Sequence, residues 1–350
     1  MVKKYSKNIF LLLVSIFALI GLFLTAGYVA IRYGFTNTEG IIDTQRTHFF
    51  ESRSSVPDDH TLACALLILK KKSVDDYKTY VDLYRKTGDI SILKQQIGVS
   101  VGTITGSTAI PSCDPKETLT TVLNEPITTR KETSFIWARD EEWLALESAI
   151  RKDEDLINTI ARQTGVSSRI LITPLVVEQL RLFHSEREIF KKFFSPLKIL
   201  GSQTQFSWGI YGLKEETAKL IENNLASTTS PFYIGEAYTH MLDFPKTATS
   251  TTEARFTRIT GKDRTYGYLY TALYLKQLMH QWESAGFPIN NRPEILGTLF
   301  NIGFKKSMPK ENPSSGGALI TINGVDYSFG ELAYQFYYSP YLIDIFPPEK

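Results

Sequence analysis

The longest uncharged run of the chain lies near its N-terminus, where residues 9–31 contain no Asp, Glu, Lys or Arg. A helix of this length reaches about 35 Å, at about 1.5 Å per residue, which is enough to span a bilayer. Lys3, Lys4 and Lys7 precede the run, and positive charge stays on the cytoplasmic side of a membrane. We therefore expect a single-pass membrane protein, with residues 1–8 in the cytoplasm, a transmembrane helix over 9–31, and the rest outside.

A cleaved signal peptide is the alternative for this N-terminal run. The apolar region of a signal peptide is normally about 7–15 residues long and ends at an Ala-x-Ala-like site. Residues 9–31 are longer than that, and Leu24-Thr-Ala-Gly27 fits such a site poorly. The pattern favours an anchor that is not cleaved.

The next part of the chain lacks the regular spacing of a single large helical domain. Residues 32–60 are polar and have no periodicity, so they predict a linker. Residues 61–139 predict a helical and irregular accessory region. Apolar spacing there indicates helices over 61–69 and 74–86, and the Thr, Gly and Pro content of 102–134 indicates a long loop.

Helical periodicity dominates after residue 140, and the fold class that follows is mainly α. Asn323-Gly324 between two apolar runs fits the positive φ values of a type I′ turn and predicts a small hairpin over 318–327. A Thr- and Ser-rich run over 246–260 predicts a loop. Pro174 either kinks one helix or begins a new one capped by Thr173. The predicted helices cover 140–162, 170–183, 214–225, 266–283, 293–304 and 330–338.

Charge and composition exclude several classes of protein. The chain has 39 Lys and Arg residues against 37 Asp and Glu residues, and three of the lysines flank the N-terminal run. The remainder is therefore close to neutral and lacks the basic surface typical of nucleic-acid binding. No paired His and Cys spacing points to a metal site. We expect no cofactor, no metal and no nucleic acid.

The chain has two cysteines, Cys64 and Cys113. The expected location outside the membrane is an oxidising compartment, which permits a disulfide. The bond would close a loop of 49 positions and add about 4 kcal/mol if it is unstrained. Cys64 lies in an apolar helical run, so a buried free thiol is the alternative. We predict the disulfide.

One carboxyl group lies within the apolar stretch 170–183. Glu178 has Val176, Val177 and Leu180 as close neighbours in sequence. Poor hydration disfavours the charged form of such a carboxyl, which suits a general acid at neutral pH. The ordinary alternative is a Glu on the solvent face of a core helix.

Three segments occur in order around this residue. The first, Val166-Ser-Ser-Arg-Ile-Leu-Ile, begins the helix that carries Glu178. The second, Gly209-Ile-Tyr-Gly212 with residues 213–218, follows about thirty residues after Glu178. The third, Phe300-Asn301-Ile-Gly303, lies far downstream. Their order and spacing resemble the lysozyme-like lytic transglycosylases. The resemblance covers about residues 140–310.

The resemblance implies a lysozyme-like helical domain over 140–350 that cleaves the β-1,4 MurNAc–GlcNAc bonds of peptidoglycan glycan strands. Glu178 is the implied acid and base, and the product is either a 1,6-anhydro end or, if water attacks, that of a muramidase. Core packing is the alternative role for the aromatic residues of the site, and helix capping the alternative for its Asn. Substrate contacts are implied for Ser207, Trp208, Gly209, Tyr211, Asn301 and Gly303.

Three positions depart from the family pattern. Gln179 follows the Glu where the family has Ser, Gly212 stands in place of Gln, and Phe300 replaces Tyr. Each change removes an expected polar group from the cleft. The alternative function is therefore a catalytically inactive lysozyme-like module that binds the cell wall or acts as a scaffold. An unrelated helical ectodomain is the third interpretation.

Overall fold

The structure is a computed structural model of the chain. It describes residues 57–106, 110–114, 116, 118–124, 133–139, 141–184, 207–245 and 250–348, with short helical runs between residues 14 and 26. The described part is mainly helical and contains few strands, which confirms the predicted mainly α class.

The expected transmembrane helix is not found. Within 9–31 the structure describes only short runs such as 17–19, while the rest of that range, residues 1–8 and residues 32–56 lie outside the described part. Nowhere in the described part is a helix both long enough and apolar enough to cross a bilayer. This finding contradicts the expected single-pass membrane localisation.

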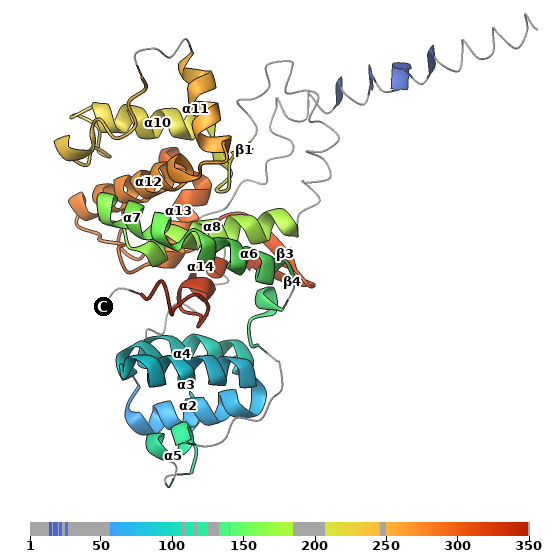
Figure 1. The fold of residues 1–350 in the computed structure, drawn as a ribbon, viewed down its shortest axis with the longest axis vertical. Coiled ribbons are helices and arrows are strands. Elements are labelled where there is room, and N and C mark those ends of the chain that lie inside the picture. The colour runs from blue at the N-terminus through green and yellow to red at the C-terminus, as the bar shows by residue number, and fades with distance from the viewer. Residues whose placement is uncertain are drawn as a thin grey trace, which may run out of the picture.

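Four helices form a small N-terminal unit (Figure 1). Asp58 caps the first by accepting a hydrogen bond from the Thr61 amide, and Gly88 ends the second in the left-handed conformation. The unit has an apolar core of its own, to which Leu62, Leu66, Tyr77, Tyr80 and Val81 contribute. The four helices are α2 (Asp59–Lys72), α3 (Val74–Thr87), α4 (Ile90–Thr105) and α5 (Leu119–Asn124).

The helix α4 is absent from the sequence prediction, and its end occupies the start of the predicted loop over 102–134. It forms because Leu93, Ile97 and Val101 recur every four residues and face the core of the unit. The linker predicted to end at residue 60 also ends earlier, since α2 begins at Asp59.

A disulfide joins Cys64 of α2 to Cys113, with the two Cα atoms 5.3 Å apart. This is the bond that the sequence predicts. It ties the segment after α4 back onto the buried face of α2.

Asp76 of α3 connects the unit to the segment that follows it. Its carboxylate accepts hydrogen bonds from the hydroxyls of Ser73 and Thr133, and from both the amide and the hydroxyl of Ser134. The side chain is fully buried, and burial raises the pKa of Asp76. The four donors offset the cost of removing the carboxyl group from water.

The larger unit is organised around α8 (Ser168–Phe183), which lies in its middle (Figure 1). Its core starts slightly before the predicted boundary at residue 140, because Phe135 and Trp137 belong to it. Helices on several sides pack against α8, namely α6 (Glu141–Lys152), α7 (Glu154–Thr164), α12 (Thr265–Ser284), α13 (Pro293–Ile302) and α14 (Phe329–Tyr337).

Short elements complete this unit. The hairpin of β3 (Leu319–Ile322) and β4 (Val325–Ser328) turns through Asn323 and Gly324, both with positive φ, as the sequence predicts. A second, shorter hairpin has no counterpart in the prediction. The elements not yet given are η2 (Ile136–Ala138), β1 (Ser207–Trp208), β2 (Leu213–Lys214), α10 (Glu215–Ala226), η5 (Glu236–Tyr238), α11 (Thr251–Thr260) and η6 (Phe304–Lys306).

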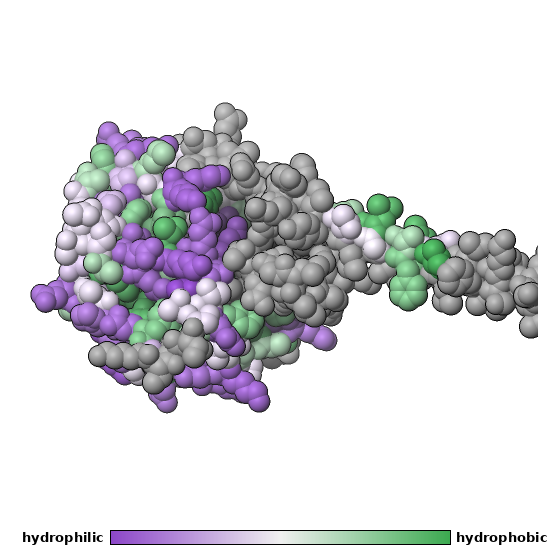
Figure 2. Space-filling model, turned by 90° about the horizontal axis from the view of Figure 1, so that it is seen from above, coloured by the Kyte–Doolittle hydropathy of each residue, from purple (hydrophilic) through white to green (hydrophobic). Residues whose placement is uncertain are grey.

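Two helical predictions need correction. The helix expected over 140–162 divides at Asp153, whose carboxylate accepts a hydrogen bond from the Tyr268 hydroxyl at 2.8 Å and pairs with Arg264 at 2.8 Å. The loop expected over 246–260 contains α11, which Ser250 caps. Seen from the end that carries α10 and α11, the described surface alternates hydrophilic side chains with small apolar patches (Figure 2).

The helix α8 is continuous, although Pro174 lies inside it. Ser167 caps its N-terminus by accepting a hydrogen bond from the Ile170 amide. The Thr173 hydroxyl donates to the Arg169 carbonyl one turn earlier, at 2.7 Å. The structure therefore excludes the second alternative left open by the sequence, a new helix that begins at Pro174 with Thr173 as its cap.

Arg169 fastens the C-terminal segment to α8. Its guanidinium is fully buried and donates only to backbone carbonyls, which surround it where α14 ends. Burial lowers the pKa of Arg169 to about 10. The end of α14 also carries partial negative charge, which favours a cation there. The five acceptors are the carbonyls of Phe336, Tyr337, Ser339, Tyr341 and Phe346.

We predict that Arg169→Met lowers the free energy of unfolding by at least about 3 kcal/mol, because buried carbonyls that lose their donors cost about 1–3 kcal/mol each. Urea unfolding followed by circular dichroism measures the change. Arg162→Met is the matched control, since Arg162 is exposed on α7. A loss of unfolding free energy no larger than that of the control would show that the hydrogen bonds of Arg169 do not stabilise the fold.

Candidate functional site

Glu178 lies in the buried part of α8. Only 3% of the residue is exposed, and its neighbours Val176, Val177 and Leu180 are buried as well. The helix has apolar residues on nearly every side because other helices cover it all round. The carboxyl group is therefore poorly hydrated, as expected from the sequence.

Arg181 is the partner of this carboxyl group. Its Nε donates to Oε2 of Glu178 at 2.9 Å and its Nη2 donates to Oε1, so the contact is bidentate. The side chains are 13% and 4% exposed for Arg181 and Glu178, respectively. A bidentate guanidinium contact fixes the orientation of the carboxyl group. Residues three apart lie on the same face of a helix. The spacing of Glu178 and Arg181 in the sequence could therefore have predicted this ion pair, which the family motifs do not include.

The turn between β1 and β2 lies against the same carboxyl group. The two strands pair with Ser207 opposite Lys214 and Trp208 opposite Leu213. Gly212 has a φ of 59°, and a Cβ on it would overlap Oε1 of Glu178 and lie 2.8 Å from Cδ. Any larger residue here would have to displace the carboxyl group from this position. Gly212 therefore leaves room for the Glu178 carboxyl group. In the family pattern, the same position counts as the loss of an expected Gln.

Gln179 joins the turn to α8. Its Nε2 donates to the carbonyl of Ile210, which lies between the two glycines of the turn. The residue that departs from the family pattern thus has a structural use: it holds the turn in place against the carboxyl group.

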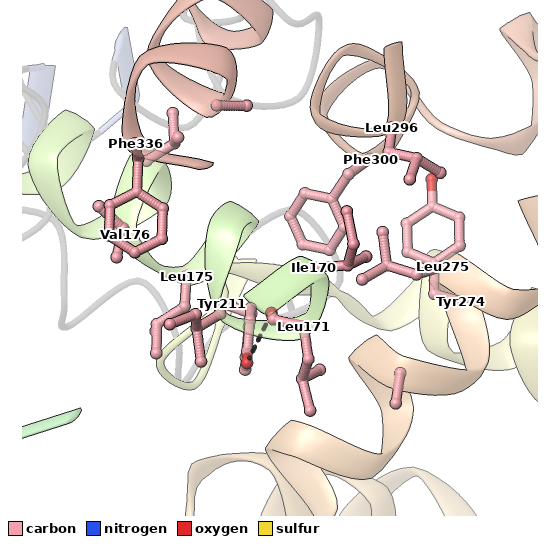
Figure 3. Close-up of a cluster of buried hydrophobic side chains, with 14 of the residues drawn as sticks. Ile170, Leu171, Leu175, Val176, Tyr211, Tyr274, Leu275, Leu296, Phe300 and Phe336 are labelled. Atoms are coloured by element: carbon pink, nitrogen blue, oxygen red, sulfur yellow. Dashed lines mark hydrogen bonds between the residues drawn. The ribbon is translucent and has the colours of Figure 1, made fainter. Parts of the chain in front are cut away.

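Tyr211 lies in the core. Its hydroxyl donates to the Leu171 carbonyl at 3.2 Å, the dashed contact in Figure 3, and its ring packs edge-on against Tyr268 and Phe300. The residue is 2% exposed. The structure therefore favours the core-packing alternative for Tyr211 over stacking on a sugar.

The remaining residues of the turn have backbone roles. Gly209 has a φ of 66°, and a Cβ on it would overlap the carbonyl oxygen of Ile259, so glycine permits the close approach of α11. Ser207 and Trp208 form β1, and their side chains lie outside the described part of the structure. Their predicted substrate contacts stay predictions.

Asn301 serves the hairpin near the C-terminus. Its Oδ1 accepts a hydrogen bond from the Ala318 amide at 2.8 Å, just before β3. The resemblance implies a substrate contact for Asn301, but its side-chain oxygen already accepts this hydrogen bond within the fold. Gly303 follows α13 with a φ of 92°, and a Cβ there would meet nothing within 4 Å. Phe300 packs between Tyr211, Tyr274 and Phe329, which connects α13 with the turn (Figure 3).

A group of possible metal ligands lies in the other unit. His60, Cys64 and Cys113 have ligand atoms within 4.8 Å of one another. Both sulfurs are joined in the disulfide, and a metal would need them as thiolates. The group therefore has no available thiolate in this state.

Comparisons of the chain with protein-family models, with curated proteins and with solved structures found no match. The resemblance to lytic transglycosylases therefore rests on the sequence motifs.

We predict that Gly212→Ala displaces the Glu178 carboxyl group and lowers the free energy of unfolding by about 2–3 kcal/mol, since overpacking adds to the strain of a positive φ. Gly88→Ala is the matched control, because Gly88 has a φ of 64° with nothing within 4 Å of its Cβ position. Chemical denaturation of both variants separates the two effects. Equal losses would mean that the carboxyl group does not lie against Gly212.

Proposed function

We propose that the chain is a peptidoglycan-cleaving enzyme of lysozyme-like fold, a lytic transglycosylase or muramidase, in which Glu178 is the general acid and base. The observation that carries the proposal is the contact between a buried carboxyl group and a tight glycine turn. The sequence resemblance rests in part on the same two segments, the helix that carries Glu178 and the turn over 209–212. A helical unit with a small hairpin is also what such a fold requires.

The chemistry needs few groups. A protonated Glu178 donates to the glycosidic oxygen as the bond breaks, and the resulting carboxylate then accepts a proton. If that proton comes from the C6 hydroxyl of the sugar, the product has a 1,6-anhydro end. If it comes from water, the product is that of a muramidase. The acetamido group of the substrate can cover the developing positive charge, so a single carboxyl group suffices.

A second candidate function is a lysozyme-like module that binds the wall without cleaving it. The contact between Glu178 and Arg181 favours this alternative, because both oxygens of the carboxyl group already accept hydrogen bonds from the guanidinium. The use of Asn301 and Tyr211 within the fold points the same way.

Release of soluble fragments from purified sacculi distinguishes the two functions. We predict that the full-length protein releases fragments and that Glu178→Gln reduces the rate by about 10²–10⁴-fold, the usual contribution of a general acid. Glu216→Gln is the matched control, because Glu216 is exposed and pairs with Lys305. Mass spectrometry of the fragments identifies anhydro or hydrolytic ends.

Equal release by the wild type and by Glu178→Gln would contradict the role of Glu178. Binding to sacculi that is equal in all three proteins, with no release from any of them, would support the non-catalytic module.

A further inference from the structure

A pocket opens at the turn between α7 and α8, against the C-terminal half of α12. The helices α7 and α12 pack side by side (Figure 1). The volume of the pocket is about 360 Å³, at the small end of the range for small-molecule sites. Glu178 does not line it, so this pocket is separate from the candidate site described above.

Lys276 of α12 places a positive charge in the wall of this pocket. The residue is partly buried, and its Nζ lies 4.9 Å from the centre of the Tyr238 ring. The same Nζ approaches Gly165, where a Cβ would be 3.3 Å from it. The Tyr238 hydroxyl donates to the Thr164 carbonyl at 3.4 Å, which orients the ring. These contacts hold the ammonium group beside the turn between α7 and α8.

This ammonium group lacks an anion. The ring of Tyr238 faces it, but no carboxylate in the described part of the chain pairs with Lys276. The two helix ends at the turn offset each other, because α7 ends at Thr164 with partial negative charge and α8 begins at Ser168 with partial positive charge. A partly buried cation is more stable with an anion beside it, so the pocket favours a negatively charged ligand.

The other groups of the wall suit a small ligand with an apolar body. Val166 and Ile170 are buried, and Ile234 and Met279 are partly buried, so together they form an apolar surface. The hydroxyl of Ser167 accepts a hydrogen bond from the Ile170 amide, and its own hydrogen can therefore be donated to a ligand oxygen. The pocket thus combines a cation, a hydroxyl donor and an apolar surface.

Charge at the rim limits the ligand to a single negative charge. Glu283 and His280 line the same pocket and are exposed. A phosphate monoester carries up to about two negative charges, and the carboxylate of Glu283 would repel the second. A monocarboxylate matches the single charge of Lys276.

We infer that this pocket binds a carboxylate on an apolar body, with the carboxylate on Lys276 and the body against Val166 and Ile170. The C-terminus of a short apolar peptide and an aliphatic acid both have this chemistry. The inference does not depend on cleavage by Glu178, so either proposal can fail without the other.

Methionine methyl groups report binding at this pocket directly. The chain has four methionines. Met279 lines the pocket, whereas Met308 is 71% exposed and does not line it. Full-length protein labelled with carbon-13 at these methyl groups is titrated, by NMR, with acetyl-Leu-Ala and with its uncharged C-terminal amide. We predict that the Met279 signal shifts with a dissociation constant at least about tenfold lower for the acid, as one charge-assisted contact allows, while the Met308 signal stays in place.

Variants of Lys276 test the origin of this preference. Lys276→Met should bind the acid and the amide about equally, and Lys276→Arg should keep the preference for the acid. If Lys276→Met folds poorly, Lys276→Gln removes the charge but keeps a polar side chain. Lys262→Met is the matched control, because Lys262 is exposed between α11 and α12 and does not line the pocket.

Three results would overturn the inference. They are equal dissociation constants for the acid and the amide in the wild type, an acid preference that persists in Lys276→Met or Lys276→Gln, and no shift of the Met279 signal with either compound. Hexanoate distinguishes the two sources of the carboxylate. Binding as tight as that of acetyl-Leu-Ala supports an aliphatic acid as the ligand, and weaker binding supports a peptide C-terminus.

Discussion

Two buried charges on one helix set the conditions that the larger unit must satisfy. Arg169 and Glu178 both lie on α8, which other helices cover on nearly every side. A charge in such surroundings is tolerated only where hydrogen bonds or an opposite charge compensate for lost water. The structure meets the requirement in two ways. Carbonyls at the end of α14 surround Arg169, whereas Glu178 has a guanidinium from its own helix.

The two solutions have different consequences. The partners of Arg169 are backbone atoms from a single chain segment, so the contact is permanent as long as the segment is folded. The partner of Glu178 is a single flexible side chain, and the other wall of its site is the Cα of Gly212. The two buried groups of α8 are therefore compensated in different ways, one by backbone carbonyls and the other by a side chain of the same helix.

The sequence predicts the parts of the fold that depend on local pattern. Apolar periodicity predicts α10, α12, α13 and α14, and the Asn323-Gly324 pair predicts the hairpin. The prediction fails where partners distant in sequence decide the outcome. Arg255 of α11, for example, is buried and pairs with Glu222 of α10, and nothing in the Thr-rich run indicates this. The uncharged N-terminal run, in turn, predicts a membrane helix that the described residues do not contain.

The candidate site shows the same division. Hydrophobic neighbours in sequence correctly predict a poorly hydrated Glu178. They cannot predict that Gly212 lies against its carboxyl group, that Gln179 holds the turn, or that Asn301 accepts a hydrogen bond from the amide just before β3. A residue missing from a family motif is easily interpreted as a loss of function. Here two of the three departures have structural roles that only the packing of the turn on α8 makes visible.

A crystal structure of the protein with a thio-linked GlcNAc–MurNAc oligomer, which resists cleavage, tests the central claim most directly. The account predicts the linking sulfur beside a carboxyl oxygen of Glu178, at about the hydrogen-bonding reach of a general acid. An oligomer bound elsewhere, with its linking sulfur away from Glu178, would contradict it.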